Sequence, residues 1–181
     1  DITGRKKAEE ALKESEERYR NLFENAHDMI QSIAPDRHFI FVNPAWLKTM
    51  GYSWEELQSL SIYDIMHPDH KARCSATFQK VMSGESVDNV EGAFVAKDGR
   101  PVNVEGNANV RSANGRVIAC DGIFRDVTER KKMEDQLFQI THDWEDTFNT
   151  ITDMITVHDK DFNIIHANKA ADKILGLPVL N

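Results

Sequence analysis

The stretch Asp126-Val127-Thr128-Glu129-Arg130-Lys131-Lys132 decides how this chain is divided. Nearly the same residues open the chain 125 positions earlier, as Asp1-Ile2-Thr3-Gly4-Arg5-Lys6-Lys7. At this offset the alignment runs without a gap to the C-terminus and gives 17 identities in 56 positions, where about three would arise by chance. We therefore interpret the sequence as an internal repeat, in which residues 1–125 form one period and residues 126–181 begin a second.

The composition is that of an ordinary globular protein, with 181 residues, 40% hydrophobic and 29% charged. A net charge of −8 argues against nucleic-acid binding, which needs a surplus of Lys and Arg on one face. No apolar run is long enough to cross a membrane, so we expect a soluble cytoplasmic segment, although its parent protein can still be membrane-anchored. Cys74 and Cys120 have no disulfide-framework spacing, which predicts free thiols in a reducing compartment.

Alternating apolar residues and turn signals predict five strands. Asp98-Gly99 and Asn114-Gly115 are strong hairpin signals, because these residues tolerate the positive φ angles that tight turns require. Ala34-Pro35-Asp36 predicts a further turn, in which Pro fixes φ. The strands are expected at residues 28–32, 37–42, 87–96, 101–111 and 116–125.

Helices are predicted between the second and third of these strands. Asn43-Pro44 is typical of a helix start and Gly51 of a helix end. A longer helix is expected to begin near His67-Pro68-Asp69 and to reach Met82. Its apolar face should cover the sheet, since Cys74, Phe78, Val81 and Met82 are spaced by four, three and one positions and lie on one side.

Seven short motifs appear in a fixed order between Leu22 and Thr128. They are Leu22-Phe23-Glu24-Asn25, Asp28-Met29-Ile30, Phe41-Val42-Asn43-Pro44-Ala45, Gly51-Tyr52, His67-Pro68-Asp69, Lys97-Asp98-Gly99-Arg100 and Asp126-Val127-Thr128. In this order and spacing they resemble the successive landmarks of a PAS domain. The resemblance implies an α+β fold, a five-stranded antiparallel sheet with helices on one face, used as a sensor or relay in bacterial and archaeal signalling proteins.

The resemblance and the repeat together predict four segments. These are an N-terminal connector helix at 1–23, a PAS domain at 24–126, a second connector helix at 127–148 and the truncated start of a second PAS domain at 149–181. In the second copy, strands are expected at 154–158 and 163–167, followed by a helix at 169–175. The parent protein is then a tandem array of PAS domains.

Both connector helices carry an apolar stripe whose members are spaced alternately by four and three residues, the a/d pattern of a coiled coil. We expect the stripes to form a parallel homodimer. The alternative is that each helix packs on the sheet of its own domain, and Ser15 and Thr147 within the stripes keep this alternative open. The residues expected at the dimer contact are Ala8, Leu12, Tyr19, Met133, Leu137 and Ile140.

We find no catalytic motif and predict no metal site. His67 and His70 are explained by a helix start, because no further ligand accompanies them. Thr141-His142-Asp143 resembles the phosphoacceptor site of sensor kinases, but the Arg and Pro that follow in that motif are missing. The sequence therefore predicts a segment without enzymatic activity.

Six side chains are candidates for lining a cavity, although Met and aromatic residues at such spacing are commonly plain core. They are Trp46, Met50, Met66, Cys74, Phe78 and Met82. Some PAS domains bind haem through a histidine on the long helix, but His70 lies only at its first turn and Cys74 is more simply a core residue. The reactive cysteine stretch of light-sensing flavin PAS domains is missing, so the cofactor is unknown and haem or flavin has no specific motif in its favour.

Asp126 and Thr128 are the predicted hinge between the sheet and the second connector helix. In PAS domains the Asp of this motif ties the helix start to the sheet, and either residue also serves as an N-cap. Our leading hypothesis is a module that detects a small molecule, a cofactor state or a partner and signals to a downstream output domain. A histidine kinase is the favoured output, ahead of a diguanylate cyclase or a transcriptional regulator. The alternative is a dimerisation spacer without a ligand.

Overall fold

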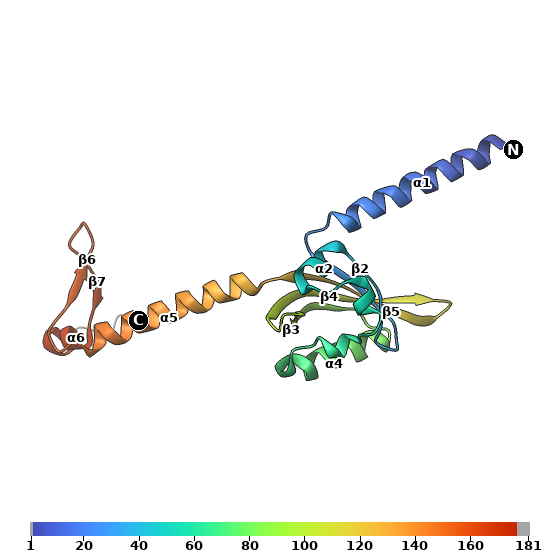
Figure 1. Cartoon of the computed structure of the whole chain (residues 1–181). Coiled ribbons are helices and arrows are strands. Elements are labelled where there is room, and N and C mark those ends of the chain that lie inside the picture. Colours follow the sequence, from blue (N-terminus) through green and yellow to red (C-terminus); the bar gives the residue numbers. More distant parts are fainter. Residues whose placement is uncertain (1, 177–181) are drawn as a thin grey trace. The chain divides into compact units, whose positions relative to one another are not determined.

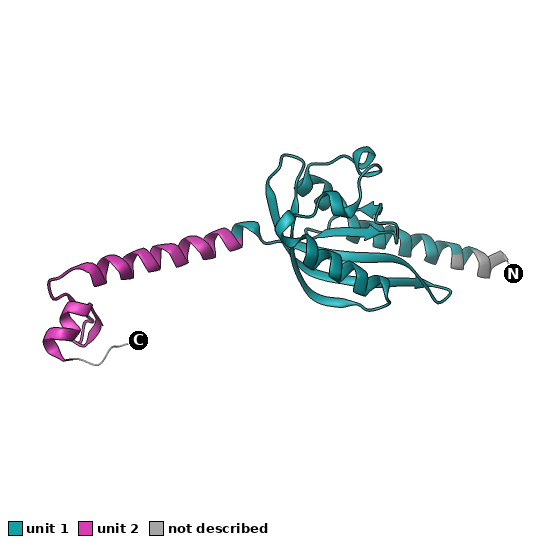
Figure 2. Cartoon of the chain, turned by 90° about the horizontal axis from the view of Figure 1, so that it is seen from below, with its two compact units in different colours: residues 1–129 teal, residues 130–181 magenta. Residues whose placement is uncertain are grey.

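The computed structural model describes residues 2–176, without the side chains of residues 2–5 and 8. The chain divides into two compact units, Asp1–Glu129 and Arg130–Asn181 (Figure 2). Each unit has its own sheet, and each is described separately below.

The first unit is an α+β domain built on a five-stranded antiparallel sheet (Figure 1). The strand order is β2-β1-β5-β4-β3, so the first strand, β1, pairs with the last strand, β5, and β2 lies at the edge beside β1. This confirms the predicted fold class. The elements are α1 (Ile2–Glu24), β1 (Met29–Ile33), β2 (Phe39–Val42), α2 (Pro44–Met50), α3 (Trp54–Leu57), η1 (Ile62–Asp64), η2 (Pro68–His70), α4 (Lys71–Met82), β3 (Val87–Val95), β4 (Pro101–Ala113) and β5 (Arg116–Asp126).

Two of the element boundaries that differ from the predictions each have a local reason. The predicted long helix from His67 is a 3-10 turn, η2, followed by α4, because the His67 ring accepts the Asp69 backbone N–H and tightens the first turn. β2 begins at Phe39 rather than residue 37, since Arg37 has a φ of 77° and stands outside the extended region. At the β4–β5 turn, Asn114 and Gly115 have φ angles of 50° and 74°, the pair of positive values that a tight hairpin requires.

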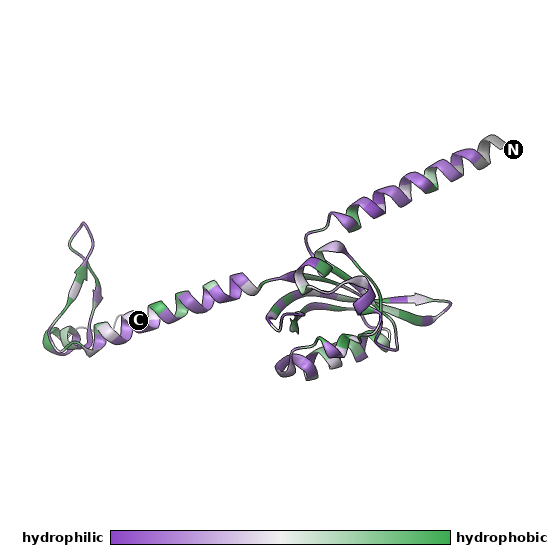
Figure 3. Ribbon diagram, viewed as in Figure 1, coloured by the Kyte–Doolittle hydropathy of each residue, from purple (hydrophilic) through white to green (hydrophobic). Residues whose placement is uncertain are grey.

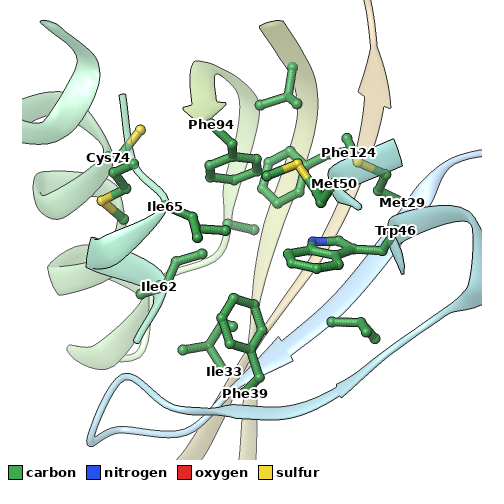
Figure 4. Close-up of a cluster of buried hydrophobic side chains, with 14 of the residues drawn as sticks. Met29, Ile33, Phe39, Trp46, Met50, Ile62, Ile65, Cys74, Phe94 and Phe124 are labelled. Carbon is green, nitrogen blue, oxygen red and sulfur yellow. The ribbon is translucent and has the colours of Figure 1, made fainter. Parts of the chain in front are cut away.

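The core lies between one face of the sheet and the helices α2 and α4 (Figure 4). Trp46 and Met50 from α2 and Val81 from α4 are completely buried. They meet Met29 and Val102 from the sheet. Each large apolar side chain buried in this way stabilises the fold by about 1.5–3 kcal/mol, and together these contacts hold the helices on the sheet.

One buried side chain, Asn43, joins three segments of the domain. Its Oδ1 accepts the N–H groups of Ile30 (2.9 Å) and Trp46 (3.1 Å), which starts α2 and fixes the end of β2 beside β1. Its Nδ2 donates to the carbonyl oxygens of Asp28 (2.9 Å) and Phe23 (3.4 Å). The amide therefore caps a helix, as predicted, and also holds the end of α1 next to the first strand.

The second unit contains most of α5 (Thr128–Thr150), which begins in the first unit, and then β6 (Thr156–His158), β7 (Ile164–Ala167) and α6 (Lys169–Leu175). Asn168 repeats the bonds of Asn43, accepting from Ile155 N and Ala171 N and donating to Asp153 O. Gly51 and Gly176 end α2 and α6 with positive φ angles of 76° and 63°. The same local structure thus recurs at the 125-residue offset.

Candidate functional site

A small cavity lies between α4 and the inner face of the sheet. Its volume is about 40 Å³. The α4 residues Cys74 and Phe78 form one wall, and Ile33, Phe94, Val104 and Phe124 from the sheet form the other. Figure 4 shows Cys74 facing Phe94 and Phe124 across this part of the core. The lining is almost entirely apolar and includes no charged side chain.

The six sequence-predicted pocket residues separate into two groups. Met66, Cys74 and Phe78 line the cavity. Trp46 and Met50 do not line it, because they are fully buried in the neighbouring core under α2. Met82, at the last turn of α4, is partly buried against the edge of the same core and also lies outside the cavity wall.

Neither haem nor flavin fits this cavity. A volume of about 40 Å³ has room for roughly three water molecules, far less than either ring system needs. No histidine lines the cavity wall. Of the two residues considered as haem ligands, His70 and Cys74, only Cys74 lines it. Among the described residues, no group of three or more His, Cys, Asp or Glu side chains is placed to hold a metal ion.

Both cysteines are free, buried and part of the cavity wall. Burial disfavours the thiolate and raises the pKa of the Cys120 thiol to about 12. Burial also raises the pKa of Cys74, partly offset by a hydrogen bond from the Ala93 backbone. The two side chains are therefore neutral thiols at physiological pH, suited to apolar packing and poorly suited to nucleophilic chemistry.

The predicted hinge residues are joined to the sheet through the backbone of Asn103 on β4. The Thr128 hydroxyl accepts the Asn103 N–H (2.9 Å), and the Val127 N–H donates to the Asn103 carbonyl oxygen (2.9 Å). The Asp126 carboxylate accepts the Thr128 N–H (2.9 Å) and so caps the start of α5. Thr128 is buried and Asp126 is exposed, so the threonine makes the contact with the sheet and the aspartate shapes the turn.

The cavity wall and the hinge share the same strands. Val104 lines the cavity and lies directly opposite Asp126 in the β4–β5 pairing. Phe124 also lines the cavity and precedes Asp126 by two residues. Asn103, which holds Thr128, is the neighbour of Val104 in the chain. The cavity wall and the first residue of α5 are therefore joined through β4 and β5.

Two residues of the site were missed by sequence reasoning. Gln31 lines the cavity and is only 5% exposed. Its position between Met29 and Ile33, with strand period two, was a signal that its side chain faces inward. Asn103 acts through its backbone, and no residue-type pattern marks such a contact.

The predicted dimer residues are exposed on two long helices. Figure 3 shows α1 and α5 as mainly hydrophilic, with separate hydrophobic positions along them. Leu12 and Tyr19 on α1 are exposed, as are Met133, Leu137 and Ile140 on α5. The dimer contact at these residues stays a prediction. The side chain of Ala8 lies outside the described residues.

Comparison with known proteins gives a consistent result. A family model described as "PAS fold" matches residues 39–124, which span β2 to β5, and one described as "PAS domain" matches residues 143–181. The chain carries a PAS domain. The PAS domain of an HTR-like protein from Haloarcula marismortui is 28% identical, with a TM-score of 0.52 over 67% of this chain and 98% of that one. A domain of a sensory box sensor histidine kinase/response regulator from Geobacter sulfurreducens is 27% identical, with a TM-score of 0.54 over 64% and 96%.

Curated relatives of this chain include a sensor and a kinase. A methyl sulfide methyltransferase-associated sensor from Methanosarcina acetivorans is 32% identical over 70% of this chain and 13% of that protein. Sporulation kinase E from Bacillus subtilis is 27% identical over 99% of this chain and 24% of that protein. The chain thus spans less than a quarter of the length of these relatives. No helix in the described part of the chain is both long and apolar enough to cross a bilayer.

Proposed function

We propose that this PAS domain is a cytoplasmic sensor or relay module that detects a small molecule in the cavity and transmits the change through α5. The observation that carries this proposal is the sharing of β4 and β5 by the cavity wall and the hinge. Val104 is in contact with the cavity and is paired with Asp126, and its neighbour Asn103 holds Thr128. A ligand that moves this wall acts on the start of α5 without any intermediate element.

The size of the response is set by differential binding. A ligand changes the hinge only to the extent that it binds one arrangement of β4 and β5 more tightly than the other. The element that changes is small, namely the two hydrogen bonds between Asn103 and Val127-Thr128. Since a net hydrogen bond contributes about 0.5–1.5 kcal/mol, modest ligand affinity is sufficient to shift this equilibrium.

We further propose that the chain works as a homodimer through the exposed apolar stripes of α1 and α5, within a tandem PAS array. Exposed Leu, Ile and Met residues at a/d spacing are stabilised by a partner helix. The match of residues 143–181 to a PAS model supports a second PAS domain that begins there. A histidine kinase is the favoured output, because the similar domain from Geobacter sulfurreducens belongs to a sensory box sensor histidine kinase/response regulator.

The test uses the parent protein with matched substitutions at the hinge. Thr128→Val removes the hydroxyl that accepts the Asn103 N–H and keeps the side-chain shape, whereas Thr128→Ser keeps the hydroxyl. Asp126→Ala and Asp126→Asn form a second pair, in which Asn retains an acceptor for the Thr128 N–H. We expect Val and Ala to change autophosphorylation or its response to stimulus, and Ser and Asn to behave as the natural protein. Unchanged output in both Val and Ala variants, with native dimer mass, would falsify the hinge.

A second function, a dimerisation spacer without a ligand, is favoured by the exposed stripes alone. Leu137 and Ile140 are 67% and 66% exposed, and their a/d spacing forms an apolar stripe that a partner helix would cover. Native mass spectrometry of the purified chain separates the two functions. A dimer with a bound small molecule favours the sensor, and a dimer that never carries one under any growth condition favours the spacer.

A further inference from the structure

The Gln31 side chain places a hydrogen-bond donor on the cavity wall that has no protein partner among the described residues. Gln31 is 5% exposed and lines the cavity. Its Oε1 accepts the indole N–H of Trp46 at 2.8 Å. An indole N–H only donates, so the amide oxygen must be the atom that faces Trp46. The NH2 group of Gln31 is left over, and no hydrogen bond from it is found among the described residues.

An unsatisfied donor in such a setting indicates a missing acceptor. Polar groups inside native proteins are nearly always paired. Among the described residues Arg111 Nε is the only fully buried side-chain nitrogen or oxygen without a hydrogen-bond partner, so the Gln31 NH2 group is not enclosed and opens onto the cavity that Gln31 lines. The wall residues Ile33, Val104 and Phe124 offer no acceptor to this group. A molecule with an acceptor atom in the cavity would pair with it.

The cavity also limits the size and charge of its occupant. A volume of about 40 Å³ corresponds to about two or three non-hydrogen atoms, since a water needs roughly 10–15 Å³ and a cavity of about 150 Å³ holds benzene. No charged side chain lines the wall, so an ionised ligand would lose its hydration without a counter-charge. The ligands that fit the cavity are therefore short and neutral.

We infer that the cavity binds a neutral organic molecule of about two or three non-hydrogen atoms, such as a short alcohol, ether or aldehyde, whose oxygen accepts a hydrogen bond from the Gln31 NH2 group. This inference rests on the proposed sensor function and names the ligand class of its cavity. The apolar part of the molecule contacts Phe78 and Phe124, and the Gln31 NH2 group donates a hydrogen bond to its oxygen. Because small ligands bind at best with about 1.5 kcal/mol per non-hydrogen atom, the dissociation constant is about millimolar or weaker.

The experiment compares two gases of nearly equal shape, dimethyl ether and propane. Each gas is dissolved in increasing amounts in a buffered solution of the ¹⁵N-labelled whole chain, and NMR spectra are recorded. Dimethyl ether accepts a hydrogen bond and propane does not. We expect dimethyl ether to shift the Gln31 side-chain NH2 resonances, with saturation in the millimolar range, and to shift backbone signals of β4 and β5. Propane is expected to leave the Gln31 NH2 resonances in place even where it enters the cavity.

The decisive quantity is the ratio of the two affinities in matched variants. Gln31→Met together with Trp46→Phe removes the donor and its partner at once, which avoids leaving the indole N–H unpaired. This double variant should lower the affinity for dimethyl ether relative to propane by about fivefold or more, the factor that one net hydrogen bond gives. Thr77→Val, which changes the other neutral polar group of the wall, should leave the ratio unchanged.

Three results overturn the inference. They are an unchanged ratio in the double variant, a loss of the ratio in Thr77→Val, and a haem or flavin that copurifies with the natural chain. If the double variant does not fold, the natural chain provides the test. Dimethyl ether must then shift the Gln31 NH2 resonances and propane must not, and any other result overturns the inference. Failure here is distinguishable from failure of the sensor function, which depends on the Thr128 and Asp126 variants in the parent protein and involves neither probe.

Discussion

The side-chain Oγ1 of Thr128 accepts a hydrogen bond of 2.9 Å from the backbone N–H of Asn103. This bond joins the first residue of α5 to β4, a strand that also forms part of the cavity wall. Thr128 is 7% exposed, so water does not readily replace the hydroxyl. The contact is therefore both a structural anchor and the proposed point of signal transfer.

Replacing Thr128 by Val should destabilise the first unit by about 1–2 kcal/mol, because the buried Asn103 N–H then has no acceptor. Urea unfolding followed by circular dichroism measures the loss. Thr128→Ser retains the acceptor and should lose less than half as much. Equal stability of the Val variant and the natural chain would show that the bond contributes nothing to the fold.

Replacing Asn43 by Ala should cost the first unit about 3–5 kcal/mol, because four hydrogen bonds to its buried amide are lost together. Trp46 fluorescence during urea unfolding reports this loss directly. Asn43→Asp keeps both accepted bonds and loses both donated ones, so its effect should be intermediate. If Asn43→Asp is as harmful as Asn43→Ala, the accepted bonds carry none of the stability.

The stability of the first unit should fall above pH 9 through Cys120. The pKa of this thiol is raised from 9.0 to about 12 in the folded protein, so the unfolded chain releases the proton first. The contribution is fully present below pH 9 and is lost as the pH rises towards 12, by at most about 1.4 kcal/mol per pH unit. Cys120→Val, which cannot titrate, should show a shallower decline in urea midpoints between pH 9 and pH 11. Parallel curves for the two proteins would refute this assignment.

Leu137→Glu should weaken the proposed dimer, since it places a charge within the apolar stripe of α5. Sedimentation equilibrium should show a shift from dimer to monomer of at least tenfold in dissociation constant. Gln136→Glu adds the same charge one position away, outside the stripe, and serves as the matched control. A natural chain that is monomeric at all concentrations, or a control that dissociates equally, contradicts the stripe as the contact.

Much of the fold was predictable because local signals and tertiary contacts agree. The Asn114-Gly115 turn and the Asn43-Pro44 cap are determined by residues a few positions apart, and both have the predicted geometry. α2 begins at Pro44 and is ended by Gly51, as these residues predict. Such features depend on backbone preferences that a single sequence carries.

The site was less predictable because it depends on distant packing. Trp46 and Met66 are both large and apolar, but only Met66 lines the cavity. Met66 is placed there by its backbone bridge to Phe94 on β3, whereas Trp46 is carried by α2 into the neighbouring core. The strand pairing that places Val104 opposite Asp126 joins residues 22 positions apart across a hairpin, and its register shifts near residue 111. One such shift exchanges inward and outward side chains, so strand periodicity alone did not identify the wall.

The Asn43 amide also bears on the order in which the domain assembles. All its bonding partners lie within 20 residues of it in the sequence, and the Asn168 set likewise closes within residues 151–171, before any later strand exists. Contacts of short sequence separation form at low entropic cost. We therefore expect the first hairpin and α2 to form an early nucleus during synthesis, onto which β5 is added last.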